Sequence, residues 1–219
     1  MHLPLAKGLF LTILNPGSVH FMPYKEKNMQ KWIPLLALGA FSNLALAADW
    51  QLDNADSKVS FISVKKGDIA EVHEFNQLSG MLADNGEFKL EIPLNGVNTG
   101  IEIRDKRMQT MLFEVANFPT LTLTAQVPAE LVEKLKPGEL LSTEIDGVLS
   151  LHGKTQNKRF DVVVARLGPS SLLVTSQKAV IVNAEEFGLT DGVEKLREIA
   201  GLSSISKAVP VSFVLRLNK

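Results

Sequence analysis

The sequence predicts a mainly β protein, an antiparallel barrel of about eight strands with a few short helices. Apolar and polar residues alternate with the two-residue period of a strand through much of the chain after residue 50. Turn sequences such as Asp84-Asn85-Gly86 and Gly168-Pro169-Ser170-Ser171 separate these runs. Such a pattern is typical of a closed barrel or a sandwich. Strand faces made only of Leu, Val, Ile and Phe imply a dry interior, and a barrel of about eight strands is wide enough to hold one small ligand.

Residues 1–47 read as a secretory signal peptide. A basic segment that ends at Lys31 precedes an apolar run at 32–41. Ala45-Leu46-Ala47 then gives the small-x-small pattern that signal peptidase accepts, so cleavage is expected between Ala47 and Ala48. The apolar run is shorter than the roughly 20 residues that a spanning helix needs, which disfavours a membrane anchor.

The start of the chain is a separate question. The residues before position 29 fit the plan of a signal peptide poorly, because Asn15-Pro16-Gly17 interrupts an apolar stretch. The expected true start is Met1, Met22 or Met29. We interpret the segment before that start as an over-extension of the reading frame.

The expected mature chain, residues 48–219, has the length of one domain. It keeps 172 of the 219 residues, with 19 of the 23 basic and 23 of the 24 acidic side chains. This mildly acidic balance gives no electrostatic case for binding nucleic acid or an anionic membrane. The chain has no cysteine, which excludes disulfides, thiol catalysis and thiolate metal sites.

Alternation predicts the first strands. A strand is expected over 58–64, and the polar turn 65–68 ends it. Strand structure resumes over 69–82. Asp84-Asn85-Gly86 then predicts a type I′ hairpin turn, because Asn and Gly tolerate positive φ. The next strand, over 88–94, has its apolar residues on one face.

The period lengthens in the middle of the chain. After a loop at 95–100, the spacing of the apolar residues predicts a helix over 103–116. Asn117-Phe118-Pro119 is expected to end it, because the residue before a proline avoids the α region.

The second half returns to the strand pattern. The expected elements, in order, are a strand over 120–127, a short helix over 128–135, a strand over 145–152 paired with 159–167 across a loop at 153–158, a strand over 172–182, a short helix over 193–200 capped by Gly201, and a last strand over 209–217.

Three segments carry a resemblance to a known family. They are Trp50-x-Leu52-Asp53-x-x-x-Ser57-x-Val59-x-Phe61, then Thr99-Gly100-Ile101-x-x-Arg104-Asp105 with Leu112-Phe113 and Asn117-Phe118-Pro119, then Gly147-x-Leu149-x-Leu151-x-Gly153-x-Thr155. In this order and spacing they resemble the YceI-like family of secreted, lipocalin-like proteins that bind polyisoprenoid lipids. The resemblance covers residues 50–217. The chain departs from many members at Lys65-Lys66, at the segment 68–75 and by a longer insertion at 128–139, which puts the ligand's identity in question more than the fold.

The resemblance implies a periplasmic protein without a cofactor that holds an isoprenoid or another long-chain lipid in an apolar cavity. It also implies that the mature chain does not insert stably into a membrane, and it leaves a homodimer open. Arg104 and Arg107 are the candidates for holding the headgroup. The candidate pocket residues are Phe61, Phe75, Met108, Met111, Leu112, Phe113, Phe118, Leu149, Leu151 and Phe213. Met108 and Met111 can equally be ordinary core on an amphipathic helix.

Two constellations could carry chemistry instead. Glu71 and His73 share one face of a strand, and with His152 they could form a metal site or an acid–base pair. No H-x-H or H-E-x-x-H spacing supports a metal, so both histidines are interpreted as surface or loop residues. Arg104 and Asp105 could form a catalytic pair. The favoured interpretation is that Asp105 caps the helix while Arg104 bonds the carbonyls of the loop at 95–100.

No catalytic residue is therefore predicted. The chain lacks a G-x-S-x-G elbow, a phosphate-binding loop and a dinucleotide fingerprint. Three hypotheses remain: a lipid-binding protein, a stress-related interaction protein without a dedicated ligand, and an enzyme that uses Arg104 and Asp105. The first is preferred.

Overall fold

The computed structural model describes residues 49–219. The predicted signal peptide, its cleavage point and the choice of start lie outside the described residues. The strands are β1 (Trp50–Leu52), β2 (Lys58–Lys65), β3 (Ile69–Phe75), β4 (Ser79–Leu82), β5 (Glu87–Pro93), β6 (Val97–Asn98), β7 (Thr120–Gln126), β8 (Leu140–Leu151), β9 (Lys154–Gly168), β10 (Ser171–Ser176), β11 (Val180–Asn183) and β12 (Ala208–Asn218). The helices are α1 (Glu102–Arg107), α2 (Ala129–Glu133) and α3 (Thr190–Ile199), with two 3₁₀ turns, η1 (Leu94–Gly96) and η3 (Ala184–Phe187), and a π-helix, η2 (Met108–Leu112).

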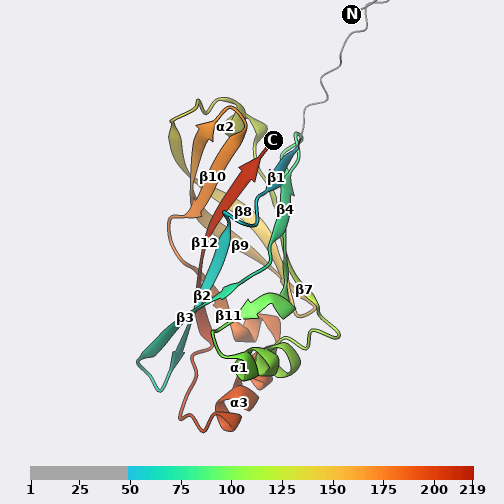
Figure 1. Ribbon diagram of the computed structural model, residues 1–219, viewed down its shortest axis with the longest axis vertical. Coiled ribbons are helices and arrows are strands. Elements are labelled where there is room, and N and C mark those ends of the chain that lie inside the picture. The colour runs from blue at the N-terminus through green and yellow to red at the C-terminus, as the bar shows by residue number, and fades with distance from the viewer. Residues whose placement is uncertain (1–48) are drawn as a thin grey trace, which may run out of the picture. The chain divides into compact units, whose positions relative to one another are not determined.

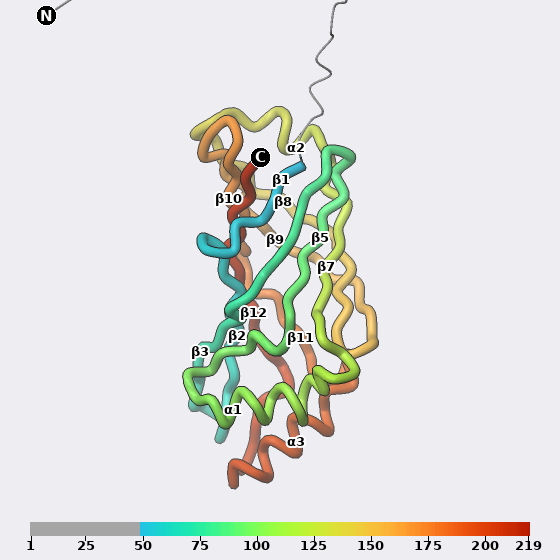
Figure 2. The backbone as a smooth tube through the Cα atoms, turned by 45° about the vertical axis from the view of Figure 1, so that its right-hand side comes forward, coloured from blue at the N-terminus to red at the C-terminus, as the bar shows by residue number. Residues whose placement is uncertain are grey.

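The strands close into an antiparallel barrel of eight, as the sequence predicts (Figures 1 and 2). Their order around the barrel is β1, β4, β5, β7, β8, β9, β10 and β12, and β12 pairs back onto β1. β12 is long enough to pair with β2 as well, through Phe61↔Val211, after pairing with β1 through Leu52↔Leu217. The β2–β3 hairpin therefore extends the barrel wall beyond its closed part.

The inward faces of the strands form the core. Alternate residues of β5 and β7 point inward, and these are the apolar positions that the sequence predicts. The largest fully buried side chains come from several elements of the barrel and from η3: Ile92, Leu94, Leu172, Phe187 and Leu217. The strand alternation thus produces one continuous apolar interior.

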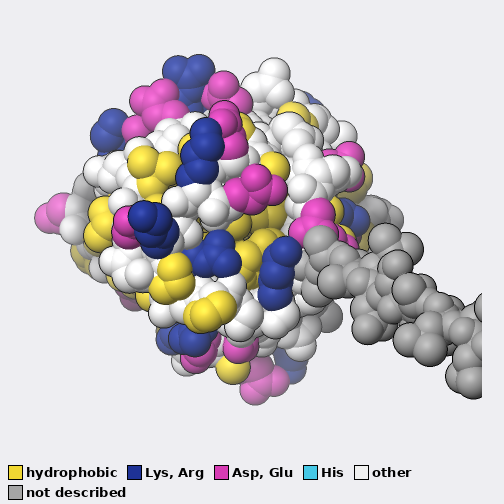
Figure 3. Space-filling view, turned by 90° about the horizontal axis from the view of Figure 1, so that it is seen from above, with side chains coloured by type: hydrophobic (Ala, Val, Ile, Leu, Met, Phe, Trp, Pro, Cys, Tyr) yellow, Lys and Arg dark blue, Asp and Glu magenta, His cyan; other side chains and the backbone are white. Residues whose placement is uncertain are grey.

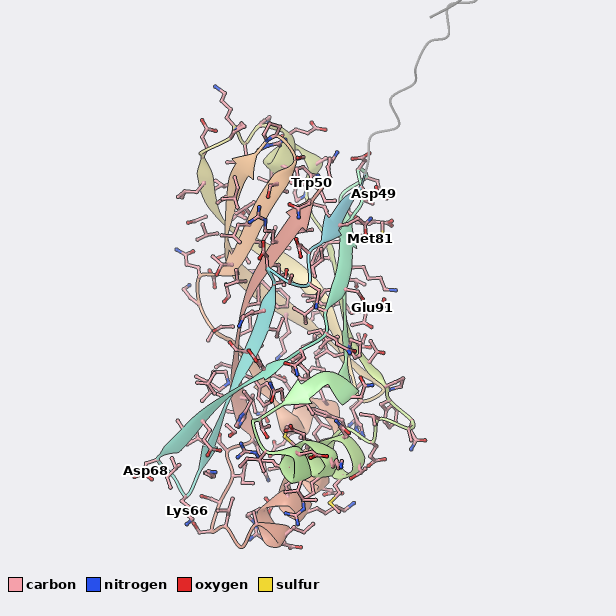
Figure 4. The ribbon with its side chains drawn as sticks, viewed as in Figure 1. Asp49, Trp50, Lys66, Asp68, Met81 and Glu91 are labelled. Carbon is pink, nitrogen blue, oxygen red and sulfur yellow. The ribbon has the colours of Figure 1, made fainter. Side chains whose placement is uncertain are left out.

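Helices cover both ends of the barrel. α1 and α3 lie at the end where the β2–β3 hairpin projects, and Figure 4 shows Lys66 and Asp68 at the tip of that hairpin, far from Trp50. α2 lies at the other end, which Figure 3 shows from above with basic and acidic side chains interspersed. Among residues 49–219, no helix is both long and apolar enough to cross a bilayer.

The central helix differs from its prediction. It begins at Glu102 and ends at Leu112, before Asn117, and its second half is a π-helix. The amide of Phe113 donates to the carbonyl of Met108, five residues back, which is the π-helical pattern. Of the apolar residues expected on one face of this helix, Met108, Leu112 and Val115 pack into the core, whereas Met111 does not.

Two turns also differ. Among Asp84, Asn85 and Gly86, only Gly86 has a positive φ, so the type I′ turn predicted there is wrong. The loop predicted at 153–158 is also wrong, because β8 and β9 pair as far as Leu151↔Lys154. Only His152 and Gly153 connect these strands, and both have positive φ, as the central residues of a type I′ turn do.

Gly192 tests how α3 packs onto the π-helix. A Cβ at this position would lie 2.8 Å from the carbonyl oxygen of Met111 and 2.9 Å from the Cα of Leu112. Helix propensity alone would make Gly192→Ala stabilising by about 1 kcal/mol. We expect the backbone clash to reverse the sign and to lower the free energy of unfolding by about 1–3 kcal/mol in urea titrations.

Gly168→Ala is the matched control, because Gly168 has no atom within 4 Å of the added Cβ and an ordinary φ. It should leave the free energy of unfolding nearly unchanged. A stabilising Gly192→Ala variant would contradict the close approach of α3 to the π-helix.

Candidate functional site

The barrel encloses an apolar cavity at the end covered by α1 and α3. We call this cavity, of about 150 Å³, the α1 chamber. Every side chain that lines it is apolar. Eight of the ten pocket residues expected from the sequence are among them: Phe61, Phe75, Met108, Leu112, Phe113, Leu149, Leu151 and Phe213.

A second apolar cavity of about 90 Å³, the α2 chamber, lies under α2. Leu131 and Val132, from the insertion at 128–139, help to line it. Four residues line both chambers: Leu90, Leu123, Phe160 and Phe213. The rings of Phe160 and Phe213 meet edge to face with 6.3 Å between their centroids, so this pair forms part of the wall between the chambers.

Met111 and Phe118 line neither chamber. Met111 lies on the π-helix, and its neighbours Met108 and Leu112 line the α1 chamber instead. The ring of Phe118 packs against His152, with 4.3 Å between the ring centroids. Contact of Met111 or Phe118 with a lipid stays a prediction.

Hydrogen bonds from Arg104 link the loop before α1 to strand β3. Its Nε donates to the hydroxyl of Thr99 (2.8 Å), one terminal nitrogen donates to the carbonyl of Thr99 (2.7 Å), and the other donates to Glu71 (2.7 Å). The sequence-based interpretation that Arg104 bonds a loop carbonyl is therefore confirmed. A headgroup would have to share a guanidinium that already has three partners.

Asp105 does not cap the helix, and that expectation is wrong. α1 begins at Glu102, with Ile101 in the N-cap position and no side-chain cap. The carboxylate of Asp105 instead reaches back to accept from the amide of Thr99 (2.9 Å) and from its hydroxyl (2.5 Å). Arg104 and Asp105 thus hold the same loop residue from two sides.

Glu71 joins this network to the β2–β3 hairpin. It accepts from Arg104 and forms an ion pair with Lys65 at 2.8 Å. The hydrogen bond from Lys65 lowers the pKa of Glu71, partial burial opposes this, and Arg104 lowers it further. Arg107, the other headgroup candidate, is half-buried, and its side chain has no hydrogen bond or ion pair within residues 49–219. Its role stays a prediction.

His73 is buried, with 5% of its surface exposed, so its interpretation as a surface or loop residue is wrong. β3 pairs with β2 in a register that places His73 opposite Phe61, on the inward face. Its Nε2 lies 2.9 Å from the hydroxyl of Ser63, and its Nδ1 is buried without a partner among the described residues. Burial lowers the pKa of His73, and the positive charge of Arg104 lowers it further.

His152 is remote from this cluster. It lies in the β8–β9 turn, where its Nδ1 is 3.3 Å from the carbonyl oxygen of Phe187. The grouping of Glu71, His73 and His152 expected as an alternative is therefore not formed. Within residues 49–219, no group of three or more His, Asp or Glu side chains could hold a metal ion.

The sequence model of the YceI-like domain family matches residues 50–217. The chain belongs to this family. A polyisoprenoid-binding domain from Saccharophagus degradans, described as implicated in plant cell wall breakdown, is 37% identical, with a TM-score of 0.76 over 77% of this chain and 97% of that one. Burkholderia cenocepacia BcnA is 18% identical, with a TM-score of 0.58 over 75% and 98% of the two chains, and shares the YceI-like fold. No curated protein matches the chain.

The burial of His73 predicts a pH dependence for this YceI-like domain. The charged groups around it are Glu71, Arg104, Lys65 and Asp105. We expect NMR titration of the imidazole to give a pKa below the ordinary value of about 6.5. As pH falls below that value, the unfolded chain binds the proton before the folded one, so the free energy of unfolding should fall.

His73→Gln identifies the NMR signal and serves as the control. Its free energy of unfolding should fall less steeply than that of the wild type as pH drops below about 6.5. A His73 pKa at or above the ordinary value would contradict the burial of an uncharged imidazole.

Proposed function

We propose that this protein is a non-catalytic lipid-binding protein that sequesters or transports an isoprenoid or another long-chain lipid. The observation that carries the proposal is the pair of chambers along the barrel, whose linings are apolar apart from Thr143. Such a lining selects for a hydrocarbon tail, because it offers a polar ligand almost no hydrogen bonds.

The energetics support a lipid tail. Each CH₂ group moved from water into an apolar site contributes about 0.8 kcal/mol, so a few isoprene units offer ample gross affinity before ordering costs. The domain that is 37% identical is described as polyisoprenoid-binding. Both arguments favour a prenyl chain as the ligand.

The two alternative hypotheses have less support. The proposed catalytic pair, Arg104 and Asp105, is engaged with Thr99 and Glu71, which gives both residues a role in holding the loop. A surface interaction protein without a ligand would be expected to have a filled interior, whereas the α1 chamber leaves about 150 Å³. A homodimer stays a prediction.

Neighbouring residues of β8 provide the test. Leu149 lines the α1 chamber, whereas Val148 is on the outer face with 37% of its surface exposed. Leu149→Trp should place an indole in the chamber and reduce binding of a C20 prenol at least tenfold. Val148→Trp should bind like the wild type. Displacement of an apolar fluorophore measures the affinities, and circular dichroism checks that both variants fold.

Equal affinities in these two folded variants would contradict binding in the barrel. A second measurement addresses the native ligand. Solvent extraction of the protein from its own host, followed by mass spectrometry, should yield a prenyl lipid. Repeated extraction without any lipid would count against the proposal.

We also propose that the barrel works in the periplasm after removal of residues 1–47. The support is the signal-peptide pattern that ends at Ala47. N-terminal sequencing of protein from the periplasmic fraction should begin at Ala48. Protein confined to the cytoplasm, or periplasmic protein that retains the leader, would contradict the proposed export and cleavage. A precursor peptide spanning His2 to His20 would show that the chain starts at Met1.

A further inference from the structure

The inner face of the β2–β3 hairpin changes from apolar to polar as it leaves the barrel. Cross-strand partners in an antiparallel pair point to the same side of the sheet. Phe61 and Phe75 line the α1 chamber on this face. Further along the hairpin, the same face carries His73 opposite Phe61 and then Glu71 opposite Ser63. Figure 4 shows that the hairpin continues from there to Lys66 and Asp68.

His73 lies at the boundary between the apolar part and the polar part of the inner face of the β2–β3 hairpin. The centroid of its imidazole lies 5.2 Å from that of Phe61, a wall residue of the α1 chamber. Its Nε2 is occupied by Ser63, but its Nδ1 is buried and has no partner within the described chain. A buried polar atom without a hydrogen bond costs free energy, which a ligand that supplies the missing partner would recover.

Among residues 49–219, His152 also has a buried nitrogen without a hydrogen-bond partner, its Nε2. This atom lies 3.9 Å from a carboxylate oxygen of Glu114, so an acidic partner stands nearby. Within residues 49–219, the hydrogen bond of the His73 imidazole to Ser63 and its contact with Glu71 are both made by Nε2. Nδ1 of His73 is therefore the stronger candidate for contact with a ligand.

The charges beyond His73 cancel. Lys65 and Arg104 are balanced by Glu71 and Asp105, and each of the two basic groups already contacts Glu71. A phosphate or diphosphate would find no free cation in this cluster to compensate its burial. Arg107 is the remaining basic residue of α1 besides Lys106, which pairs with Glu102. If the protein binds a lipid with a diphosphate end group more tightly than one with an uncharged end group, Arg107 and not His73 would be the residue that contacts it.

We propose that Nδ1 of His73 forms a hydrogen bond with an uncharged oxygen, a hydroxyl or a carbonyl, at the end of a lipid whose tail enters the α1 chamber. This inference rests on the proposed lipid-binding function and specifies the class of ligand. The lowered pKa of His73 agrees with a neutral imidazole at this position.

The tautomer determines which oxygen fits. A neutral imidazole carries one N–H and one bare nitrogen. If Nε2 accepts from Ser63, Nδ1 carries the hydrogen and can donate to a hydroxyl or a carbonyl. If Nε2 donates to Ser63, Nδ1 is an acceptor, and only a hydroxyl can pair with it. An alcohol is therefore the end group that fits both states.

The test compares three ligands that share a C20 prenyl tail: geranylgeraniol, geranylgeranyl diphosphate and the hydrocarbon without an oxygen. Dissociation constants are measured for the wild type, His73→Leu, His73→Gln and the control Val72→Leu, which alters the outer face of β3. The wild-type ratio of alcohol to hydrocarbon affinity should exceed that of His73→Leu about tenfold. His73→Gln should keep part of this ratio, and Val72→Leu all of it.

A readout without substitution complements the affinities. The ¹⁵N shift of His73 Nδ1 should change when the alcohol binds and stay nearly constant with the hydrocarbon, so the inference can be tested even if His73→Leu does not fold. Equal affinity ratios in the wild type and His73→Leu, an unchanged Nδ1 shift, or a preference for the diphosphate would overturn the inference alone. Binding of none of the three ligands would overturn the proposed function and the inference with it.

Discussion

The pairing of β12 with strands on both of its sides is the constraint on which the rest of the structure depends. β12 joins β10 and β11 on one side to β1 and β2 on the other. This closure pairs the backbone N–H and C=O groups of strand edges that would otherwise be open. It also turns the apolar faces of all the strands toward one interior. Leu215 and Leu217 then pack into the same interior as Phe213. Both chambers exist because this ring of strands is complete.

Alternation made most of this barrel predictable, because a period of two is visible in a single sequence. The strand over 120–127 and the last strand have the predicted inward faces, since each inward residue is apolar and, apart from Pro210, each neighbour is polar or exposed. The π-helix was not predictable in the same way. Met108 and Met111 fit an α-helical stripe, and only the hydrogen bond from Phe113 to Met108 reveals the wider turn.

The apolar half of the candidate site could be predicted, whereas its polar boundary could not. Phe61, Leu149 and Phe213 belong to clean alternating runs, so the sequence already places them in the interior. His73 lies in a strand whose other residues are partly apolar and partly charged, without a clear alternation. Its burial follows from the register that places it opposite Phe61. Register depends on partners far along the chain. The alternation of Glu71, His73 and Phe75 was the one local signal that His73 shares a face with a core residue.

The size of the chambers indicates how a lipid would enter them. A cavity of 150 Å³ lined by apolar residues holds a molecule of about benzene's size, so the α1 chamber fits about one isoprene unit. A longer tail would reach the α2 chamber through the wall that Leu90, Leu123, Phe160 and Phe213 share, for instance by separating Phe160 from Phe213. An edge-to-face aromatic pair contributes about 0.5–1.5 kcal/mol beyond its burial. The five carbons of a further isoprene unit gain about 4 kcal/mol at 0.8 kcal/mol per carbon. Because this gain exceeds the contribution of the aromatic pair, a longer tail can displace the part of the wall that Phe160 and Phe213 form.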